Sequence, residues 1–323
     1  MSSRTKTILE YVKGKKTLYH LVHEIKNKHH LKHFIKKYAI PANLRTPLKK
    51  IYKKLIGKYK KVKLLDYKNG SVLCAFDHMQ LYFDLVAPLN FYEIFINDAI
   101  NETPYIDPSQ KYNVIDMGAN RGYTVLHWAN QPWCKKVFAF ECAQETFDML
   151  SENVNLNPHL KDKIELYPYG LSDADADFVL YTIKGLDISA TSNLELLKKT
   201  WPQQANEITT IKCQAKKSSG IIKKILDEHP NETFIFKVDV EGSEYAIFKD
   251  LTQNCPEVFD RVETLFLETH LGWEKLDKYI QALNKDYILD TFYVNGIDIH
   301  MLVYTKLTMG YWARKFHWTR FDE

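Results

Sequence analysis

The chain has 323 residues, of which 45% are hydrophobic and 26% are charged, so it can form one large domain with an appendage and is not disordered as a whole. No apolar run approaches the roughly 18–20 residues that cross a bilayer, and the first 30 residues lack the apolar segment of a signal peptide, so we expect a cytoplasmic protein without a spanning helix. Five cysteines without a C-x-x-C pair predict free thiols and no structural zinc site.

The net charge of +4 conceals a basic first segment and an acidic remainder. Residues 1–63 contain 19 Lys or Arg and only two acids. Apolar residues recur at helical spacing within 18–25, 31–38 and 48–59, which predicts two or three basic amphipathic helices. Such helices either dock on the main domain or bind an anionic partner. A membrane surface is the first candidate for that partner and nucleic acid is the alternative.

The last residues repeat this combination of charge and apolar surface. Aromatic and basic side chains alternate over residues 311–321, a composition typical of the headgroup layer of a membrane. The alternative is a tail that packs on its own domain. We therefore divide the chain into an extension (1–63), a main domain (64–307) and a tail (308–323).

Strands and helices alternate through the main domain. Short apolar runs predict strands, and apolar residues every three or four positions predict helices. This alternation predicts an α/β fold, with a mostly parallel sheet, helices on both faces and a terminal antiparallel pair of strands. In chain order we expect strand 112–116, helix 123–130, strand 137–141, helix 144–155, strand 164–171, an inserted β pair at 178–183 and 208–214, strand 234–239, helix 245–251, strand 262–268, helix 274–283 and the closing β pair at 288–294 and 299–306.

The turn after the first of these strands has the composition of a ligand-binding loop. Ligands of open α/β sheets bind beyond the carboxyl ends of the strands, where residues 116–122 read D-M-G-A-N-R-G. Gly118 and Gly122 let a ligand approach the backbone closely. Asp116 would repel a phosphate and attract an ammonium group, and Glu141 ends the next strand, where a carboxylate accepts hydrogen bonds from a ribose diol. A ligand that carries a ribose and an ammonium group but no phosphate would suit this loop, and S-adenosylmethionine fits that description better than NAD.

Two motifs of the chain resemble those of the FkbM-type methyltransferases. The first is V-I-D-M-G-A-N-R-G-Y-T at residues 114–124, and the second is K-V-D-V-E-G-S-E at residues 237–244, similar to the family pattern K-[IV]-D-[VI]-E-G-x-E. Two shorter stretches also match the wider sequence pattern of the family, namely Tyr92-Glu93 before the first motif and Leu171-Ser172-Asp173 after the third strand. The resemblance covers about residues 72–305 and leaves the basic segment unexplained.

The resemblance implies a Rossmann-like class I methyltransferase that transfers a methyl group from S-adenosylmethionine, usually to a hydroxyl oxygen. It places residues 116–122 at the methionine half of the cofactor, Glu141 at the ribose, and Asp239 at the sulfonium. The adenine would lie against Cys142 and the strand at 171–172. The complete set of cofactor-binding residues that we expect is Glu93, Asp116, Gly118, Asn120, Gly122, Tyr123, Thr124, Glu141, Cys142, Leu171, Ser172 and Asp239.

Catalysis requires a group that removes the proton of the acceptor. A sugar hydroxyl has a high pKa, so a general base or a metal should assist. The candidates at the strand ends are Asp239, Glu241 and His270, and His270 is preferred because its unperturbed pKa lies near 6.5. We expect no metal, although Asp239, Glu268 and His270 could hold a divalent ion. Glu241 and Glu244 could instead stabilise the first turn of the following helix.

These features predict an O-methyltransferase for a sugar hydroxyl in a glycolipid or surface polysaccharide, acting at the cytoplasmic face of a membrane. The sugar is an analogy with the family. An RNA ribose 2′-O-methyltransferase and a catalytically inactive scaffold of the same fold are the alternatives. Acceptor contacts would come from the insertion at 178–213, in which residues 188–201 could form a lid.

Overall fold

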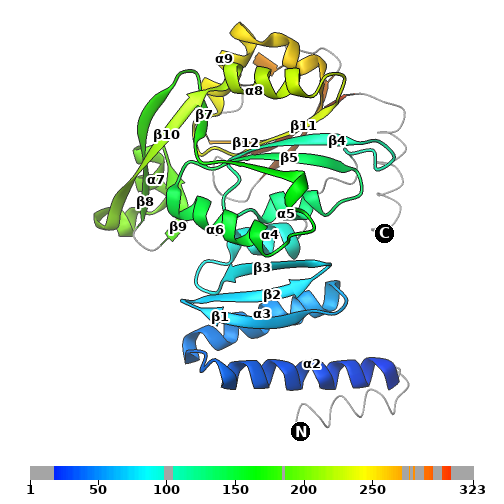
Figure 1. Ribbon diagram of the computed structural model, residues 1–323. Helices are drawn as coiled ribbons and strands as arrows, with labels where there is room; N and C mark the ends of the chain where they lie inside the picture. Colours follow the sequence, from blue (N-terminus) through cyan, green and yellow to red (C-terminus); the bar gives the residue numbers. More distant parts are fainter. Residues whose placement is uncertain are drawn as a thin grey trace. The chain divides into compact units, whose positions relative to one another are not determined.

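The computed structural model describes residues 18–97, 105–183, 186–270, 276, 279–280, 287–293 and 300–306 (Figure 1). The chain divides into two compact units, Met1–Asp98 and Ala99–Glu323. Among the described residues, no helix combines the length and the apolar character that a membrane crossing requires. The predicted tail 308–323, the turn between the last two strands and most of the predicted helix 274–283 lie outside the described residues.

The first unit joins the predicted basic helices to an antiparallel sheet. Leu48, Ile51 and Leu55 are fully buried, so the predicted apolar stripe of the second helix forms the core of this unit. The hydroxyl of Tyr38 donates a hydrogen bond to the carbonyl of Leu65 at 2.8 Å, which fixes the first helix to the sheet. The compact unit that contains these helices extends to Asp98, whereas the predicted extension was bounded at residue 63. Its elements are α2 (Leu18–Lys37), α3 (Ala42–Lys58), β1 (Lys63–Lys68), β2 (Ser71–Phe76), β3 (Met79–Asp84) and α4 (Leu89–Phe95).

The second unit contains the predicted α/β sheet. Its seven strands have the order β13-β14-β12-β11-β4-β5-β6. The strands from β12 to β6 are parallel, and β14 pairs antiparallel with both β12 and β13, as the sequence predicted. The strands are β4 (Tyr112–Met117), β5 (Cys134–Phe140), β6 (Ile164–Tyr167), β11 (Phe234–Val238), β12 (Val262–Thr269), β13 (Tyr287–Tyr293) and β14 (His300–Lys306).

Helices cover both faces of this sheet (Figure 1). On one face, Ile222 of α8 and Phe248 of α9 join Phe236 in a single buried core cluster. On the other face lie α5 and α6. Trp128 of α5 packs there against Phe266 of β12, with 5.6 Å between the centroids of the two rings. The α8 helix was not among the sequence-based expectations. The helices are α5 (Tyr123–Ala129), α6 (Gln144–Asn155), α8 (Ser218–Glu228) and α9 (Glu244–Asn254), with the short 3-10 helices η1 (Lys161–Lys163) and η3 (Pro256–Asp260).

The insertion forms a second sheet with the strand order β7-β10-β8-β9. The predicted antiparallel pair is confirmed as β8 and β10. The predicted single strand 164–171 is wrong, because the chain leaves the main sheet at Pro168 and β7 joins the inserted sheet instead. Proline lacks the N–H that a sheet ladder requires. The elements are β7 (Gly170–Ser172), β8 (Ala176–Ile183), β9 (Leu186–Thr191), α7 (Leu194–Thr200), η2 (Pro202–Glu207) and β10 (Ile208–Lys217).

Candidate functional site

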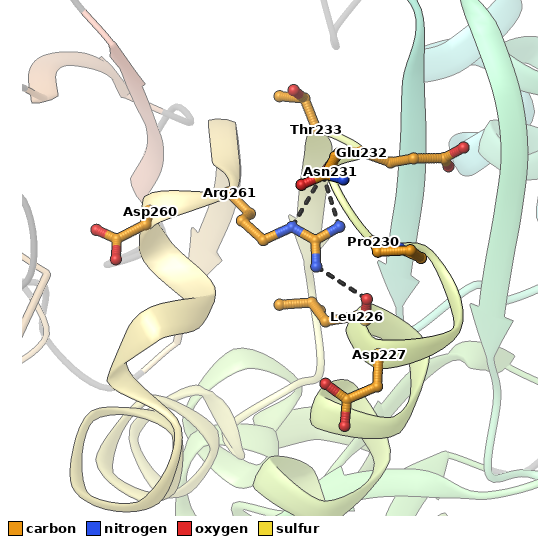
Figure 2. Close-up of a pocket in the computed structure, with 8 residues that line it drawn as sticks. All are labelled: Leu226, Asp227, Pro230, Asn231, Glu232, Thr233, Asp260 and Arg261. Atoms are coloured by element: carbon orange, nitrogen blue, oxygen red, sulfur yellow. Dashed lines mark hydrogen bonds between the residues drawn. The ribbon is translucent and has the colours of Figure 1, made fainter.

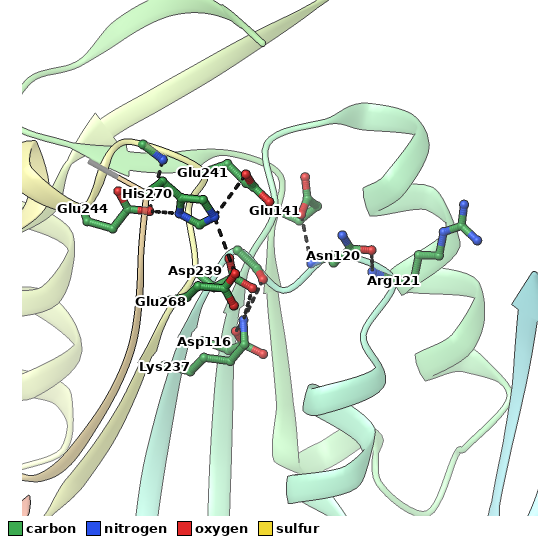
Figure 3. A network of polar contacts seen from close by, with 12 residues as sticks. Asp116, Asn120, Arg121, Glu141, Lys237, Asp239, Glu241, Glu244, Glu268 and His270 are labelled. Carbon is green, nitrogen blue, oxygen red and sulfur yellow. Dashed lines mark hydrogen bonds and ion pairs between the residues drawn. The ribbon is translucent and has the colours of Figure 1, made fainter. Parts of the chain in front are cut away.

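Three neighbouring strands bring most of the predicted site residues to one edge of the main sheet (Figure 3). Because β4, β11 and β12 are parallel neighbours, their carboxyl ends meet there. Asp116 lies at the end of β4, Asp239 follows β11, and Glu268 lies near the end of β12. We call Asp239, Glu241, Glu244 and Glu268 the acid cluster.

Lys237 joins the ends of β4 and β11 and was not among the predicted site residues. Its Nζ lies 3.2 Å from Oδ1 of Asp116 and 3.5 Å from Oδ2 of Asp239, and it donates a hydrogen bond to the carbonyl of Gly118 at 3.1 Å. Lys237 and Asp116 are register partners in the sheet. Burial lowers the pKa of Lys237, but the charges of Asp116 and Asp239 more than offset this and raise it above its usual range.

Asp116 is fully buried behind this lysine. Its exposed fraction is 0%, and outside the ion pair with Lys237 neither carboxylate oxygen accepts a hydrogen bond from the described residues. Burial raises the pKa of Asp116, and the charge of Lys237 opposes the rise. Asp239 keeps 31% of its side chain exposed, so Asp239 is the acid of this pair that a ligand can touch.

The backbone conformation and the packing of the protein, and not only a ligand, require the two glycines of the first motif. Gly118 and Gly122 have φ values of +85° and +79°, which disfavour side chains. A Cβ atom on Gly118 would lie 1.8 Å from the carbonyl oxygen of Asp239, and one on Gly122 would lie 2.3 Å from Cδ1 of Leu150. The close approach of Gly118 to Asp239 shows that the loop after β4 packs directly against the loop after β11, and Gly122 packs against Leu150 of α6.

Glu141 organises the loop that was expected to hold the cofactor. Its two carboxylate oxygens accept backbone N–H groups of Asn120 at 2.9 Å and Ala143 at 2.8 Å. Burial raises the pKa of Glu141, and these two hydrogen bonds oppose the rise. Each oxygen retains a second lone pair, so the carboxylate can still accept a ribose hydroxyl.

His270 is surrounded by carboxylates. Its Nδ1 lies 2.8 Å from Oε1 of Glu244, and its Nε2 lies 3.3 Å from Oε2 of Glu241 and 3.6 Å from Oε1 of Glu268. Burial lowers the pKa of His270, but the hydrogen bond with Glu244 and the charge of Glu241 more than offset this effect and raise it to about 10. His270 is therefore cationic at neutral pH, which removes the reason for preferring it as the base.

The carboxylates outnumber the cations at this edge. Asp116 and the acid cluster supply five carboxyl groups against two basic side chains, Lys237 and His270. Loss of hydration raises the pKa of Glu241 to about 8 against the opposing charge of His270. Burial and the charge of Asp239 raise the pKa of Glu268 to about 8 as well. The site therefore favours a cationic ligand, which would restore the ionised form of both glutamates.

The same edge contains a group of side chains that could hold a metal ion. Asp239, Glu268 and His270 offer ligand atoms that all lie within 4.8 Å of one another. A metal ligand must present a neutral imidazole, so a divalent ion bound here would displace the proton that the neighbouring carboxylates favour on His270. The donor set of two carboxylates and one imidazole is compatible with a divalent ion as well as with an organic cation.

The insertion is fastened to the acid cluster through the backbone of Glu241. The carbonyl oxygen of Glu241 accepts hydrogen bonds from the backbone N–H of Ser192 at 3.1 Å and the hydroxyl of Thr191 at 2.9 Å. Glu241 itself has a φ of +53°. This conformation costs energy for residues other than glycine and is often found at functional sites. The segment 188–201, which was predicted as a lid, thus contacts the backbone of the acid cluster at Thr191 and Ser192.

The remaining predicted cofactor residues lie in several environments. Tyr123 and Thr124 are buried in the first turn of α5, and Leu171 is buried in the core cluster. Cys142 is partly exposed and follows Glu141. The carbonyl of Ser172 accepts the hydroxyl of Ser218 at 2.7 Å, whereas Glu93 belongs to α4 of the first unit and its role stays a prediction.

A separate pocket of about 460 Å³ lies at the opposite ends of the strands (Figure 2). Arg261 fills one side of it and donates hydrogen bonds to the carbonyl oxygens of Leu226 at 2.9 Å and Glu232 at 3.1 Å. The pocket adjoins the start of β11 and β12, away from the carboxyl ends that bind ligands in this fold. Arg261 there closes the end of α8, and we assign this pocket no catalytic role.

Comparisons with known proteins agree with this architecture. Residues 116–297 match the family model of the methyltransferase FkbM domain. The chain is 27% identical over 198 residues to the methyltransferase sdnD of Sordaria araneosa, a match that covers 55% of this chain and 73% of that relative.

Two solved structures are also similar. A methyltransferase FkbM from Methylobacillus flagellatus KT has a TM-score of 0.41 at 15% identity, and the match covers 60% of this chain but 43% of that one. The TrmK protein of M. capricolum, in complex with S-adenosylhomocysteine, has a TM-score of 0.36 at 9% identity, with 65% and 68% coverage. This chain therefore spans less than half of the first of these two structures.

Proposed function

The chain belongs to the FkbM methyltransferase family, and on that premise we propose that it transfers the methyl group of S-adenosylmethionine to a hydroxyl oxygen of a carbohydrate. The observation that carries the proposal is the excess of carboxylates at the carboxyl ends of β4, β11 and β12. Burial raises the pKa values of Asp116, Glu241 and Glu268, so a bound cation would stabilise their ionised forms. The donor carries one positive charge on its sulfur and one on its ammonium group.

The residues present fit this donor. Asp239 would meet the positive end of the methionine half, because it is the exposed acid beside the loop 118–122. Asp116 would not touch the donor. It would act through Lys237, which forms ion pairs with both Asp116 and Asp239 and holds their carboxylates in place. Glu141 would accept the ribose hydroxyls on its free lone pairs. The bound donor supplies an activated methyl group, because neutral sulfur is the leaving group.

Glu241 is the residue that we propose as the general base. A sugar hydroxyl loses its proton as its oxygen attacks, so the base should have a pKa near the working pH. The pKa of Glu241, raised to about 8, meets that requirement, whereas that of His270, raised to about 10, does not. The side chain of Glu241 is also the most exposed of the acid cluster, at 37%, so an acceptor can reach it, although water at the exposed part also limits the rise of its pKa. His270 would hold Glu241 in position and, as a cation, stabilise its ionised form.

The acceptor is proposed to be a sugar of a glycolipid or surface polysaccharide, presented at the cytoplasmic face of a membrane. Two features support a polyhydroxylated acceptor. The family analogy is the first, and the second is the polar segment Thr191, Ser192 and Asn193, which lies directly beside Glu241. The hydroxyls of Thr191 and Ser192 donate to the carbonyl of Glu241 and would hold this polar segment beside the proposed base.

The proposal is tested by following labelled methyl groups from S-adenosylmethionine into a fractionated cell extract. Label in alkali-stable glycolipid or polysaccharide is the expected result, and label in RNA or protein alone would reject the acceptor. The Glu241→Gln variant should lose at least about a hundredfold in turnover at saturating donor, because removal of a general base costs roughly that factor. Glu228→Gln, in an exposed acid of α8 outside the insertion, is the control and should keep full turnover.

A further inference from the structure

The two helices α2 and α3 present a strongly basic surface. Together they contain ten lysines and one arginine, and Glu24 is their single acid. This excess of positive charge cannot be neutralised within the two helices. All eleven basic side chains are exposed: Lys26, Lys28, Lys32, Lys36, Lys37, Arg45, Lys49, Lys50, Lys53, Lys54 and Lys58.

The basic side chains lie opposite the buried side of each helix. In α3 the buried residues include Leu48, Ile51 and Leu55, and the lysines at 49–50 and 53–54 fall between them at the positions that a helical period places on the outer side. In α2, Phe34 is buried and its neighbours at 36–37 are exposed lysines. The charge is therefore displayed away from the core of the first unit.

The apolar stripe of α3 is buried within the first unit. Leu48, Ile51 and Leu55 have exposed fractions of 0% because they form the core of the first unit. No Phe, Tyr or Trp among residues 26–58 is exposed in the structure. A partner of this surface would consequently be bound by charge and not by burial of apolar side chains.

We propose that this basic surface of α2 and α3 binds the headgroups of an anionic phospholipid membrane. Each lysine near such a surface strengthens binding several-fold, and the attraction needs no pocket or fixed geometry. Nucleic acid is less well matched, since its recognition uses arginine forks and exposed aromatic side chains, and the surface has a single arginine, Arg45. The guanidinium of Arg45 already donates its Nε hydrogen bond to the carbonyl of Ile40 at 2.8 Å.

This inference deepens the proposed function, because it would bring the enzyme to an acceptor on a lipid carrier. The test is sedimentation of the full chain with vesicles of phosphatidylcholine alone, or with about 30% phosphatidylglycerol, at about 0.1 M salt, where the screening length is about 10 Å. At least about tenfold more protein should bind the anionic vesicles. That binding should disappear at about 1 M salt, where the screening length is about 3 Å.

Charge reversal locates the binding surface. The variant Lys49→Glu, Lys50→Glu, Lys53→Glu and Lys54→Glu should lose at least about tenfold in vesicle binding, and the same positions changed to Gln should give an intermediate loss. The control carries the same change at exposed lysines of the second unit, Lys198, Lys199, Lys223 and Lys224, and should bind as the wild type does. Circular dichroism verifies that each variant is folded.

Three results would overturn the inference: equal binding to both kinds of vesicle, an equal loss in the control variant, or retention on RNA without any binding to vesicles. Donor binding by calorimetry on the same preparations separates this inference from the proposed function. Vesicle binding needs no donor, so a protein that binds the donor but not vesicles refutes only the membrane surface.

Discussion

Replacement of Lys237 by Met tests how the buried charges at the sheet edge are held. The change leaves Asp116, with an exposed fraction of 0%, without its cationic partner. Removing one partner of a buried ion pair costs about 3–5 kcal/mol of stability. For a unit of this size, each kcal/mol lowers the melting temperature by about 2–4 °C, so we expect a fall of about 6–20 °C.

The pH dependence of this loss has a definite sign. Without Lys237 the folded-state pKa of Asp116 rises further above the unfolded value of about 3.9, since burial then acts unopposed. The loss should therefore be largest at pH 7.5 and should shrink as the pH falls toward 3, below the unfolded pKa, where Asp116 is mostly protonated in both states. Chemical denaturation followed by circular dichroism at both pH values measures it.

A double-mutant cycle isolates the pair from other effects. The variant Lys237→Met with Asp116→Asn should recover about 1–3 kcal/mol of the loss, because the uncompensated charge is gone. The exposed Lys223, 3.8 Å from Asp227, is the matched control, and Lys223→Met should cost less than about 1 kcal/mol. Strictly additive losses, or a Lys237→Met variant as stable as the control, would refute the reasoning.

Three further changes probe the same edge. Gly118→Ala should abolish donor binding or folding, since its Cβ would overlap the carbonyl of Asp239; a variant with wild-type calorimetry would contradict this contact. The raised pKa of His270 contributes stability that is complete below about pH 6.5 and is lost as the pH rises toward about 10, so the deficit of His270→Gln in denaturation should shrink across that range. Chelation by EDTA should change turnover less than about twofold if the donor itself is the cation at Asp239, Glu268 and His270, and a large loss restored by a divalent ion would show a metal requirement.

The sequence predicted which residues meet at the sheet edge better than it predicted how they pair. Asp116, Asp239 and Glu268 end neighbouring strands, and alternation with the next helices located those ends. The partnership of Lys237 with Asp116 depends on the register of two parallel strands, which a single sequence does not contain. A signal was nevertheless present, since Lys237 and Asp239 are two positions apart and therefore share one side of their strand.

Other differences have local causes. The sharp turn at Glu241, with a φ of +53°, brings its carboxylate beside His270, and nothing in the composition marks that conformation. The apolar spacing of Ile222, Ile225 and Leu226 could have revealed α8, because these residues lie one turn apart. Pro168 similarly marks the point where the predicted third strand ends.

Calorimetry with S-adenosylmethionine tests the central claim most directly, namely that the acid cluster binds a cationic donor. We expect saturable binding by the wild type and a loss of at least about tenfold in affinity for Asp239→Asn, because an ion pair in a desolvated site is worth more than about 1.4 kcal/mol. Absence of heat at millimolar donor, or equal affinity of both proteins, would contradict the claim.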